Sequence, residues 1–271
     1  MSQSQYLDSI EEIISDKVSE FQDSGITVTV QDKIPLGDFP MNTWLRIPDV
    51  ICIFVDIRGS TKLSATTHDK STASVYEFFT GTAVKIFHEL GASYIDIKGD
   101  GVFALFNKEE VFLALAAAIS FKTFVSEKFI PQMQKEIPNL DIGVHMGIDQ
   151  KTVLVKQVGL RDDASRDSRK NEVWAGKPIN MAAKLASRSR DDELWVSERF
   201  FHNLKNNELV MKSCGCFVNG QSNNIKIDLW QETDLSDDDN FDFDKAFVLK
   251  SVWCKNHGKE WCTNIINLDN E

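Results

Sequence analysis

The chain is built around residues 50–56, VICIFVD, an apolar and β-branched run that ends in an aspartate. A run of this kind is typical of a buried strand. Arg58-Gly59-Ser60 follows as a turn, and residues 61–90 have the pattern of one or two helices. The strand and its turn therefore fix a starting point from which the other elements can be placed.

The segments downstream indicate the fold class. Strands are predicted at 93–97 and 102–106, joined in a hairpin by the tight turn Gly99-Asp100-Gly101. Next come an Ala-rich helix, a strand, a second strand that could form a hairpin with the first, a helix and a last strand, at 109–129, 141–147, 152–158, 178–187 and 193–196. The β-α-β-β-α-β order predicts an α+β, ferredoxin-like core, with helices packed on a mostly antiparallel sheet.

The two ends of the chain differ from this core. Residues 1–46 contain an amphipathic helix and a linker, and the helix would pack on its own domain or pair with a second subunit. Residues 47–205 form the predicted main domain, which contains all the elements placed so far. Residues 206–271 form an extension whose acidic stretch, 232–244, is predicted to be a solvated loop.

Composition excludes several classes of protein. The 271 residues carry a net charge of −11, which argues against a basic groove for nucleic acid. The sequence has no apolar run long enough to span a membrane, and its start lacks the pattern of a signal peptide. With five cysteines and no export signal, we expect a cytoplasmic protein with reduced thiols.

Two aspartates suggest a metal site. Asp56 ends the first strand and Asp100 lies in the hairpin turn, so both carboxylates can meet at one edge of the sheet. They would repel each other unless a cation lies between them, and hard oxygen ligands suit Mg²⁺ or Mn²⁺. The N–H groups of the turn after Asp56 could bind phosphates at a helix start. The alternative is that each aspartate is only a helix cap or a turn former.

A second group of ligand types lies in the extension. Cysteine and histidine side chains there could hold a structural Zn²⁺ ion. The spacing is irregular, so buried thiols packed beside tryptophans are the alternative. The candidate ligands are Cys214, Cys216, Cys254, His257 and Cys262.

Four segments in order resemble the catalytic domain of class III adenylate and guanylate cyclases. They are FVDIRGST (54–61), GASYIDIKGDGVFALF (91–106), IGVHMG (142–147) and EVWAGKPINMAAKLA (172–186). The resemblance implies a homodimer with shared active sites. Each site would close a nucleoside triphosphate into a 3′,5′-cyclic monophosphate and release pyrophosphate.

The resemblance also implies residue roles. Two divalent ions, Mg²⁺ or Mn²⁺, would be held by Asp56, Asp100 and the carbonyl of Ile57, and phosphates by Gly59, Ser60 and Thr61. From the other subunit, Asn180 would orient the ribose. Lys184 stands where most members have an arginine that stabilises the transferred phosphoryl group, and lysine lacks the planar fork of arginine.

The base-reading positions depart from the adenylate cyclase pattern. By this alignment they are Phe54, Asp96 and Val173, and Asp96 replaces a lysine. An ionised aspartate accepts hydrogen bonds, so it favours a base with an N–H on its pairing edge, which guanine, uracil and cytosine all have.

The closest likeness is to the bacterial pyrimidine cyclases of Pycsar antiphage defence, in which a separate effector senses the cyclic nucleotide. This likeness implies UTP as substrate, then CTP. Adenylate or guanylate cyclase activity, and an inactive cyclase-like domain that only binds nucleotide, remain as alternatives.

Overall fold

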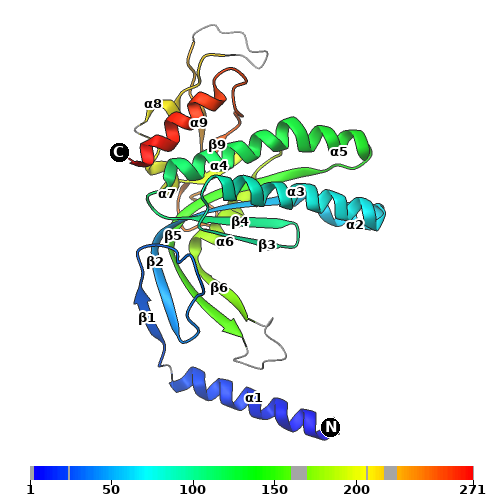
Figure 1. Ribbon diagram of the computed structural model, residues 1–271, viewed down its shortest axis with the longest axis vertical. Helices are drawn as coiled ribbons and strands as arrows, with labels where there is room; N and C mark the ends of the chain where they lie inside the picture. The colour runs from blue at the N-terminus through cyan, green and yellow to red at the C-terminus, as the bar shows by residue number, and fades with distance from the viewer. Residues whose placement is uncertain (1–2, 24, 160–169, 206, 217–224, 271) are drawn as a thin grey trace.

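A computed structural model describes residues 3–23, 25–159, 170–205, 207–216 and 225–270. One sheet runs through the chain in the order β3-β4-β2-β5-β7-β9-β8, with β1 beside β2 and β6 beside β5 (Figure 1). Only the β1–β2 and β5–β7 pairs are parallel among the pairings of the described residues. The predicted α+β class with a mostly antiparallel sheet is confirmed. The strands are β1 (Thr27–Val30), β2 (Thr43–Arg58), β3 (Tyr94–Lys98), β4 (Gly101–Phe106), β5 (Gly143–Gly159), β6 (Lys170–Gly176), β7 (Leu194–Ser197), β8 (Trp230–Asp234) and β9 (Lys245–Leu249).

Strand β2 lies between β4 and β5, and its alternate side chains point to the two opposite faces of the sheet. Ile51, Ile53 and Val55 point to one face and join the larger apolar core. Cys52 and Phe54 alternate with them and point to the other face, where a smaller core lies. The strand starts earlier than the sequence predicts, because a bulge between Ile47 and Val50 carries it past Pro48.

Helices cover the larger core on one face of the sheet (Figure 1). In α4 the run 114–118 is wholly buried, because alanine and leucine let the helix approach the sheet closely. A π-helical segment, Val125–Phe129, joins α4 to α5. The α-helices are α1 (Gln3–Asp23), α2 (Ser60–Thr66), α3 (Asp69–Glu89), α4 (Val111–Phe124), α5 (Ile130–Glu136), α6 (Lys177–Arg188), α7 (Glu198–His202), α8 (Glu208–Met211) and α9 (Gly258–Asn267).

The predicted hairpin between 141–147 and 152–158 is wrong, since both segments belong to the single strand β5. The polar residues between them resemble a turn in the sequence, but the structure gives each a partner. Asp149 is fully buried and accepts both arms of the Arg199 guanidinium, at 3.1 and 2.6 Å. Gln150 accepts a hydrogen bond from Asn203 at 2.8 Å. Because these groups are satisfied, the chain can stay extended through them.

The C-terminal residues continue the same sheet and core. Strand β9 pairs with β7, and α9 packs on α4. The carboxylate of Asp269 accepts the backbone N–H groups of Phe112 and Leu113 at the start of α4, at 2.9 and 2.7 Å. This carboxylate satisfies donors that the first turn of a helix cannot pair internally.

The acidic stretch 232–244 is only in part the solvated loop that the sequence predicts, because residues 235–244 form a loop with mostly exposed carboxylates while other residues of the stretch are packed. Its first residues belong to β8, and Leu235 and Phe243 are buried. Asp242 forms ion pairs with Lys177 at 2.7 Å and with Arg199 at 2.8 Å. The carboxylate of Asp242 thus pairs with a cation of α6 and a cation of α7.

Helix α1 projects away from the rest of the chain (Figure 1). One of the two interpretations of the sequence is that this helix packs on its own domain. The exposed apolar side chains of the helix contradict that interpretation. The exposed apolar residues of this helix are Leu7, Ile10, Ile13, Ile14, Val18 and Phe21.

Candidate functional site

The end of β2 and the β3–β4 turn bring Asp56 and Asp100 together. Both side chains are half-buried. Burial, followed by the charge of Asp100 and a hydrogen bond between the two carboxyl groups, raises the pKa of Asp56 to about 6. The backbone next to Asp100 also lies close to Asp56, since a Cβ atom at Gly101 would be 3.3 Å from Asp56 Oδ1.

This carboxylate pair fits a divalent cation. Asp100 Oδ2 is buried and has no hydrogen-bond partner among the described residues. A buried carboxylate oxygen without a donor is costly, and a cation would satisfy it. Pairing between β2 and β4 ends at Val55, so the backbone at Ile57 lies beyond the last pair on that side. The donor set is made of oxygens, as Mg²⁺ and Mn²⁺ prefer.

Gly101 leaves room for this pair. A Cβ atom at that position would lie 3.3 Å from Asp56 Oδ1 and 3.1 Å from Cζ of Phe54. A larger residue would therefore press directly on the carboxylate and on the neighbouring ring.

The turn after β2 has a fixed backbone shape. Gly59 has φ 87°, and a Cβ atom there would lie 2.6 Å from the backbone oxygen of Asp141. The first intrahelical hydrogen bond of α2 runs from Leu63 N to Gly59 O, at 2.9 Å. The N–H groups of Ser60 and Thr61 precede that bond, so α2 itself cannot pair them.

Arg58 anchors the same turn to two other loops. Its guanidinium donates to Asp141 at 2.9 Å through each terminal nitrogen, and to Asp191 at 3.1 and 2.8 Å. These two carboxylates raise the pKa of Arg58 still further. The sequence did not reveal this role, because the partners lie 83 and 133 residues away.

The proposed base-reading residues are only partly brought together. Phe54, Phe103 and Asp96 face one another in register across β2, β4 and β3, so they share one face of the sheet. The carboxylate of Asp96 accepts from Ile97 N at 2.8 Å and pairs with Lys98 at 2.7 Å.

Val173 lies on β6 and is 41% exposed. Its neighbours Glu172 and Trp174 point to the opposite side of that strand, where they meet Tyr94 of β3. The Tyr94 hydroxyl donates to Glu172 at 3.3 Å, and its ring lies 4.7 Å from that of Trp174. The structure therefore places Glu172 and Trp174, which the sequence did not single out, beside the strand of Asp96.

Helix α6 lies on the face of the sheet that carries Phe54. Gly147 of β5 pairs with Phe54 and permits this approach, because a Cβ atom there would overlap Ala182 O of α6. Asn180 is exposed on this helix. Lys184, one turn later, donates to the backbone oxygen of Asn240 at 2.7 Å. Within one chain, the ammonium group is thus directed at the acidic segment 235–244 rather than at the carboxylate pair.

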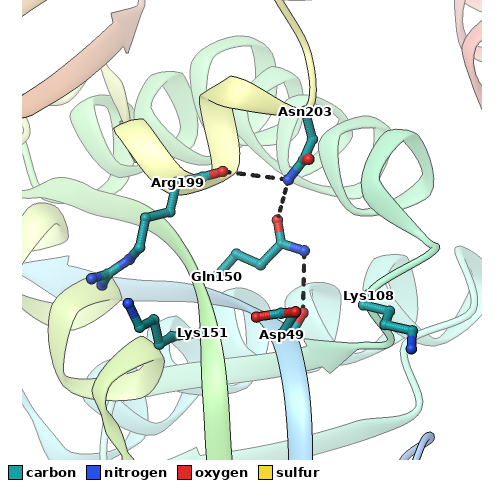
Figure 2. Close-up of a pocket in the computed structure, with 6 residues that line it drawn as sticks. All are labelled: Asp49, Lys108, Gln150, Lys151, Arg199 and Asn203. Carbon is teal, nitrogen blue, oxygen red and sulfur yellow. Dashed lines mark hydrogen bonds between the residues drawn. The ribbon is translucent and has the colours of Figure 1, made fainter.

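A separate hollow of about 440 Å³ opens beside the bulge near the middle of β2 (Figure 2). There Asn203 donates to Gln150, which donates to the backbone oxygen of Asp49 at 3.2 Å. Asp49 has φ 50° at the bulge, so this chain of hydrogen bonds holds a strained backbone. The hollow lies roughly seven residues of strand, or about 23 Å, from Asp56. Its polar residues are therefore explained by their contacts with the bulge, and not by a part in the Asp56 site.

Two known proteins are similar to this chain over most of its length. The chain is 36% identical over 229 residues to a uridylate cyclase from Propioniciclava tarda, covering 83% of this chain and 71% of that protein. A uridylate cyclase from Micromonospora echinofusca is 32% identical over 226 residues, covering 82% and 71%. The chain belongs to the uridylate cyclase family. No family model matches the sequence.

Solved structures give the same fold. The adenylyl cyclase CyaB from P. aeruginosa aligns with a TM-score of 0.55 at 19% identity, over 77% of this chain and 96% of that one. The guanylate cyclase domain of RhGC from Catenaria anguillulae, in complex with GTP, aligns with a TM-score of 0.54 at 16% identity, over 76% and 98%. This uridylate cyclase relative therefore has the architecture of class III nucleotidyl cyclases. In the part of the chain that the structure describes, no helix is long and apolar enough to cross a membrane.

Proposed function

We propose that the protein converts UTP into 3′,5′-cyclic UMP and pyrophosphate. The observation that carries this proposal is the Asp56–Asp100 pair, with its buried unpartnered oxygen, next to the Gly59 turn. Membership of the uridylate cyclase family supports UTP as the substrate. The strand order β3-β4-β2-β5 supports a ferredoxin-like core for this site.

The chemistry follows from the residues. Asp56, Asp100 and the Ile57 carbonyl would hold two Mg²⁺ or Mn²⁺ ions, which lower the pKa of the ribose 3′-hydroxyl and neutralise phosphate charge when bound. The N–H groups of Ser60 and Thr61 bind the β- and γ-phosphates. The 3′-oxygen then forms a bond to the α-phosphorus while the bond to pyrophosphate breaks, and the hydroxyl proton leaves to solvent.

The second half of each site would come from a partner subunit. Asn180 is exposed and so is free to orient a ribose bound to another copy of the chain. The exposed apolar side chains of α1 support a homodimer, because such a stripe is costly in water. Lys184 would have to exchange the carbonyl of Asn240 for the phosphate of the partner's nucleotide.

Mixing two inactive variants tests the shared site. Asp100→Asn and Asn180→Ala homodimers should each be inactive. In a mixed dimer one site carries both changes and the other carries none, so activity should return on subunit exchange. An active Asn180→Ala homodimer, or no recovery in a sample whose exchange is verified by native mass spectrometry, would rule out the shared arrangement.

We assign base recognition to Phe54, Asp96 and Val173, as the family alignment implies. The ion pair with Lys98 supports an ionised Asp96, which can accept the N3–H of uracil. The Asp96→Asn variant should lower kcat/KM for UTP by roughly 5- to 150-fold, which corresponds to the cost of about 1–3 kcal/mol for leaving a buried hydrogen-bonding group of the base without its partner. An unchanged kcat/KM for UTP would remove Asp96 from base recognition.

The activity itself is tested by incubating the protein with each nucleoside triphosphate and Mn²⁺ and identifying products by mass. Cyclic UMP should dominate, and Asp100→Asn should abolish it. Glu77→Gln changes an exposed carboxylate on α3 and serves as a matched control that keeps activity. Conversion of ATP alone would refute the assignment of the base.

A nucleotide-binding module without turnover is the second candidate. The observation that favours it is the contact of Lys184 with Asn240, which occupies the cation expected to assist the reaction. Such a module would bind UTP and form no product with either metal ion.

We also place the cyclase in Pycsar-type antiphage defence, with cyclic UMP sensed by a separate effector protein. This proposal rests on the family. Cells that express the chain with its neighbouring genes should resist phage, and the Asp100→Asn version should not protect them.

A further inference from the structure

Four soft ligand groups from two segments converge at the end of the C-terminal extension. Cys214 and Cys216 follow α8, while Cys254 and His257 lie in the turn before α9. One ligand atom of each of the four residues lies within 4.8 Å of all the others. Some 40 residues separate the two segments, as in the Cys216–His257 contact, so folding rather than local sequence brings them together.

The distances fit a tetrahedral metal ion. His257 Nδ1 lies 3.5 Å from Sγ of Cys216 and 3.7 Å from Sγ of Cys254. A tetrahedral Zn²⁺ with Zn–S of about 2.3 Å and Zn–N of about 2.0–2.1 Å places sulfur and nitrogen about 3.6 Å apart. The two sulfur–nitrogen distances thus already match the spacing that such an ion imposes, and the other ligand pairs lie within 4.8 Å.

Packing of buried thiols does not explain the cluster. Free cysteines without a ligand are usually buried in the apolar core of a protein. In this cluster Cys214 is exposed, and Cys216 and Cys254 are only half-buried. Cys262 shows the contrast, since it is buried in the main apolar core and lies outside the group. Of the five candidate ligands in the sequence, four therefore form the group and Cys262 does not belong to it.

A disulfide is not present among these thiols either. All three cysteines are free thiols. If two of them formed a disulfide, the third thiol and the imidazole would still have no explanation for their place in the cluster. Three thiolates and one neutral imidazole form a complete structural zinc set.

We propose that Cys214, Cys216, Cys254 and His257 bind one structural Zn²⁺ ion. Four protein ligands leave no open position for water or substrate, so the ion would not take part in the reaction. This zinc site is independent of the Mg²⁺ or Mn²⁺ site at Asp56, which has oxygen ligands.

The surrounding contacts show what the ion would stabilise. Gly258 N donates to Cys254 O at 2.7 Å, and Trp261 N donates to His257 O at 2.8 Å, so the turn leads directly into α9. The indole of Trp261 donates to Leu209 O of α8 at 2.7 Å. The ion would therefore tie α8 to the start of α9, the helix that packs on α4.

Metal analysis of the purified full-length protein tests the proposal. After dialysis against a mild chelator to remove ions held by carboxylates, we expect about one zinc per chain, as a four-ligand site requires. Cys216→Ser and His257→Ala should lose it, while Cys262→Ser should keep it. The ligand variants should also unfold at a lower temperature than Cys262→Ser does.

Two measurements on the unaltered chain keep the test decisive if ligand variants do not fold. A mercurial reagent that blocks thiols should release the zinc in step with thiol modification. Protein grown with Co²⁺ should show thiolate-to-cobalt charge-transfer bands and the intense visible bands of tetrahedral cobalt. Zinc-free protein from zinc-supplemented cells, with the thiols of Cys214, Cys216 and Cys254 all freely reactive, would overturn the proposal and leave the cyclase assignment untouched.

Discussion

Replacing Asp100 by asparagine should stabilise the metal-free protein while it removes activity. Burial, the charge of Asp100 and the shared hydrogen bond raise the pKa of Asp56 from 3.8 to about 6. That difference corresponds to about 3 kcal/mol against the folded state near neutral pH. Burial is the largest cause of this pKa shift, and Asp56 is only half-buried, so solvent screens its interaction with Asp100. We therefore assign about 1 kcal/mol of the lost folding stability to Asp100. An asparagine would remove that charge and could donate to Asp56.

The sign of the pH dependence follows from the same pKa. The unfolded chain loses the Asp56 proton near pH 3.8, and the folded protein keeps it up to about pH 6. The free energy of unfolding of the metal-free protein should therefore fall as the pH rises between these two values, and stay low above them. The Asp100→Asn variant should show a weaker slope.

Thermal unfolding near neutral pH is the assay. In chelator, Asp100→Asn should melt about 2–4 °C above the unaltered protein, the shift expected for about 1 kcal/mol in a chain of this size. Addition of Mn²⁺ should raise the Tm of the unaltered protein and of the Glu77→Gln control, but not of Asp100→Asn. A variant that melts lower in chelator and responds equally to Mn²⁺ would show that the two carboxylates neither oppose each other nor share an ion.

Three further outcomes are expected. Gly59→Ala should lose about 2 kcal/mol of stability in chemical denaturation, because an alanine at positive φ would meet the backbone of Asp141; a neutral result would mean that the turn can rearrange. Arg199→Leu should cost about 3–5 kcal/mol by leaving Asp149 charged and buried, and Asp149→Asn in the same chain should recover much of it. Ile14→Asp on α1 should shift the protein towards monomer in analytical ultracentrifugation without changing its circular dichroism, and an unchanged mass would exclude α1 from the dimer contact.

The local sequence pattern predicted the elements that hold the carboxylate pair. The apolar run before Asp56 and the glycines around Asp100 specify a buried strand and a tight turn without help from distant residues. The α+β class followed from their order.

Long-range partners decided what the sequence could not predict. The polar residues inside β5 resemble a turn until Arg199 and Asn203 are seen to satisfy them. The acidic stretch resembles a free loop until its partners on α6 are known. Arg58 likewise has no local sign of its role, because its carboxylate partners come from two distant loops.

The contacts between the C-terminal residues and α6 have a practical consequence. Asp242 pairs with Lys177 at the first turn of that helix, Asp238 pairs with Arg188 at its last turn, and the Asn240 carbonyl holds Lys184 between them. The segment 238–242, which follows the four cyclase motifs in the sequence, thus contacts α6 at three points along the helix. A shortened protein, cut after β7 because the four cyclase segments all lie before that point, would leave Lys177, Lys184 and Arg188 without their partners on the surface expected to meet the partner's nucleotide. Biochemical experiments on this cyclase should therefore use all 271 residues. Absence of activity in a truncated protein would not show that the full-length enzyme is inactive.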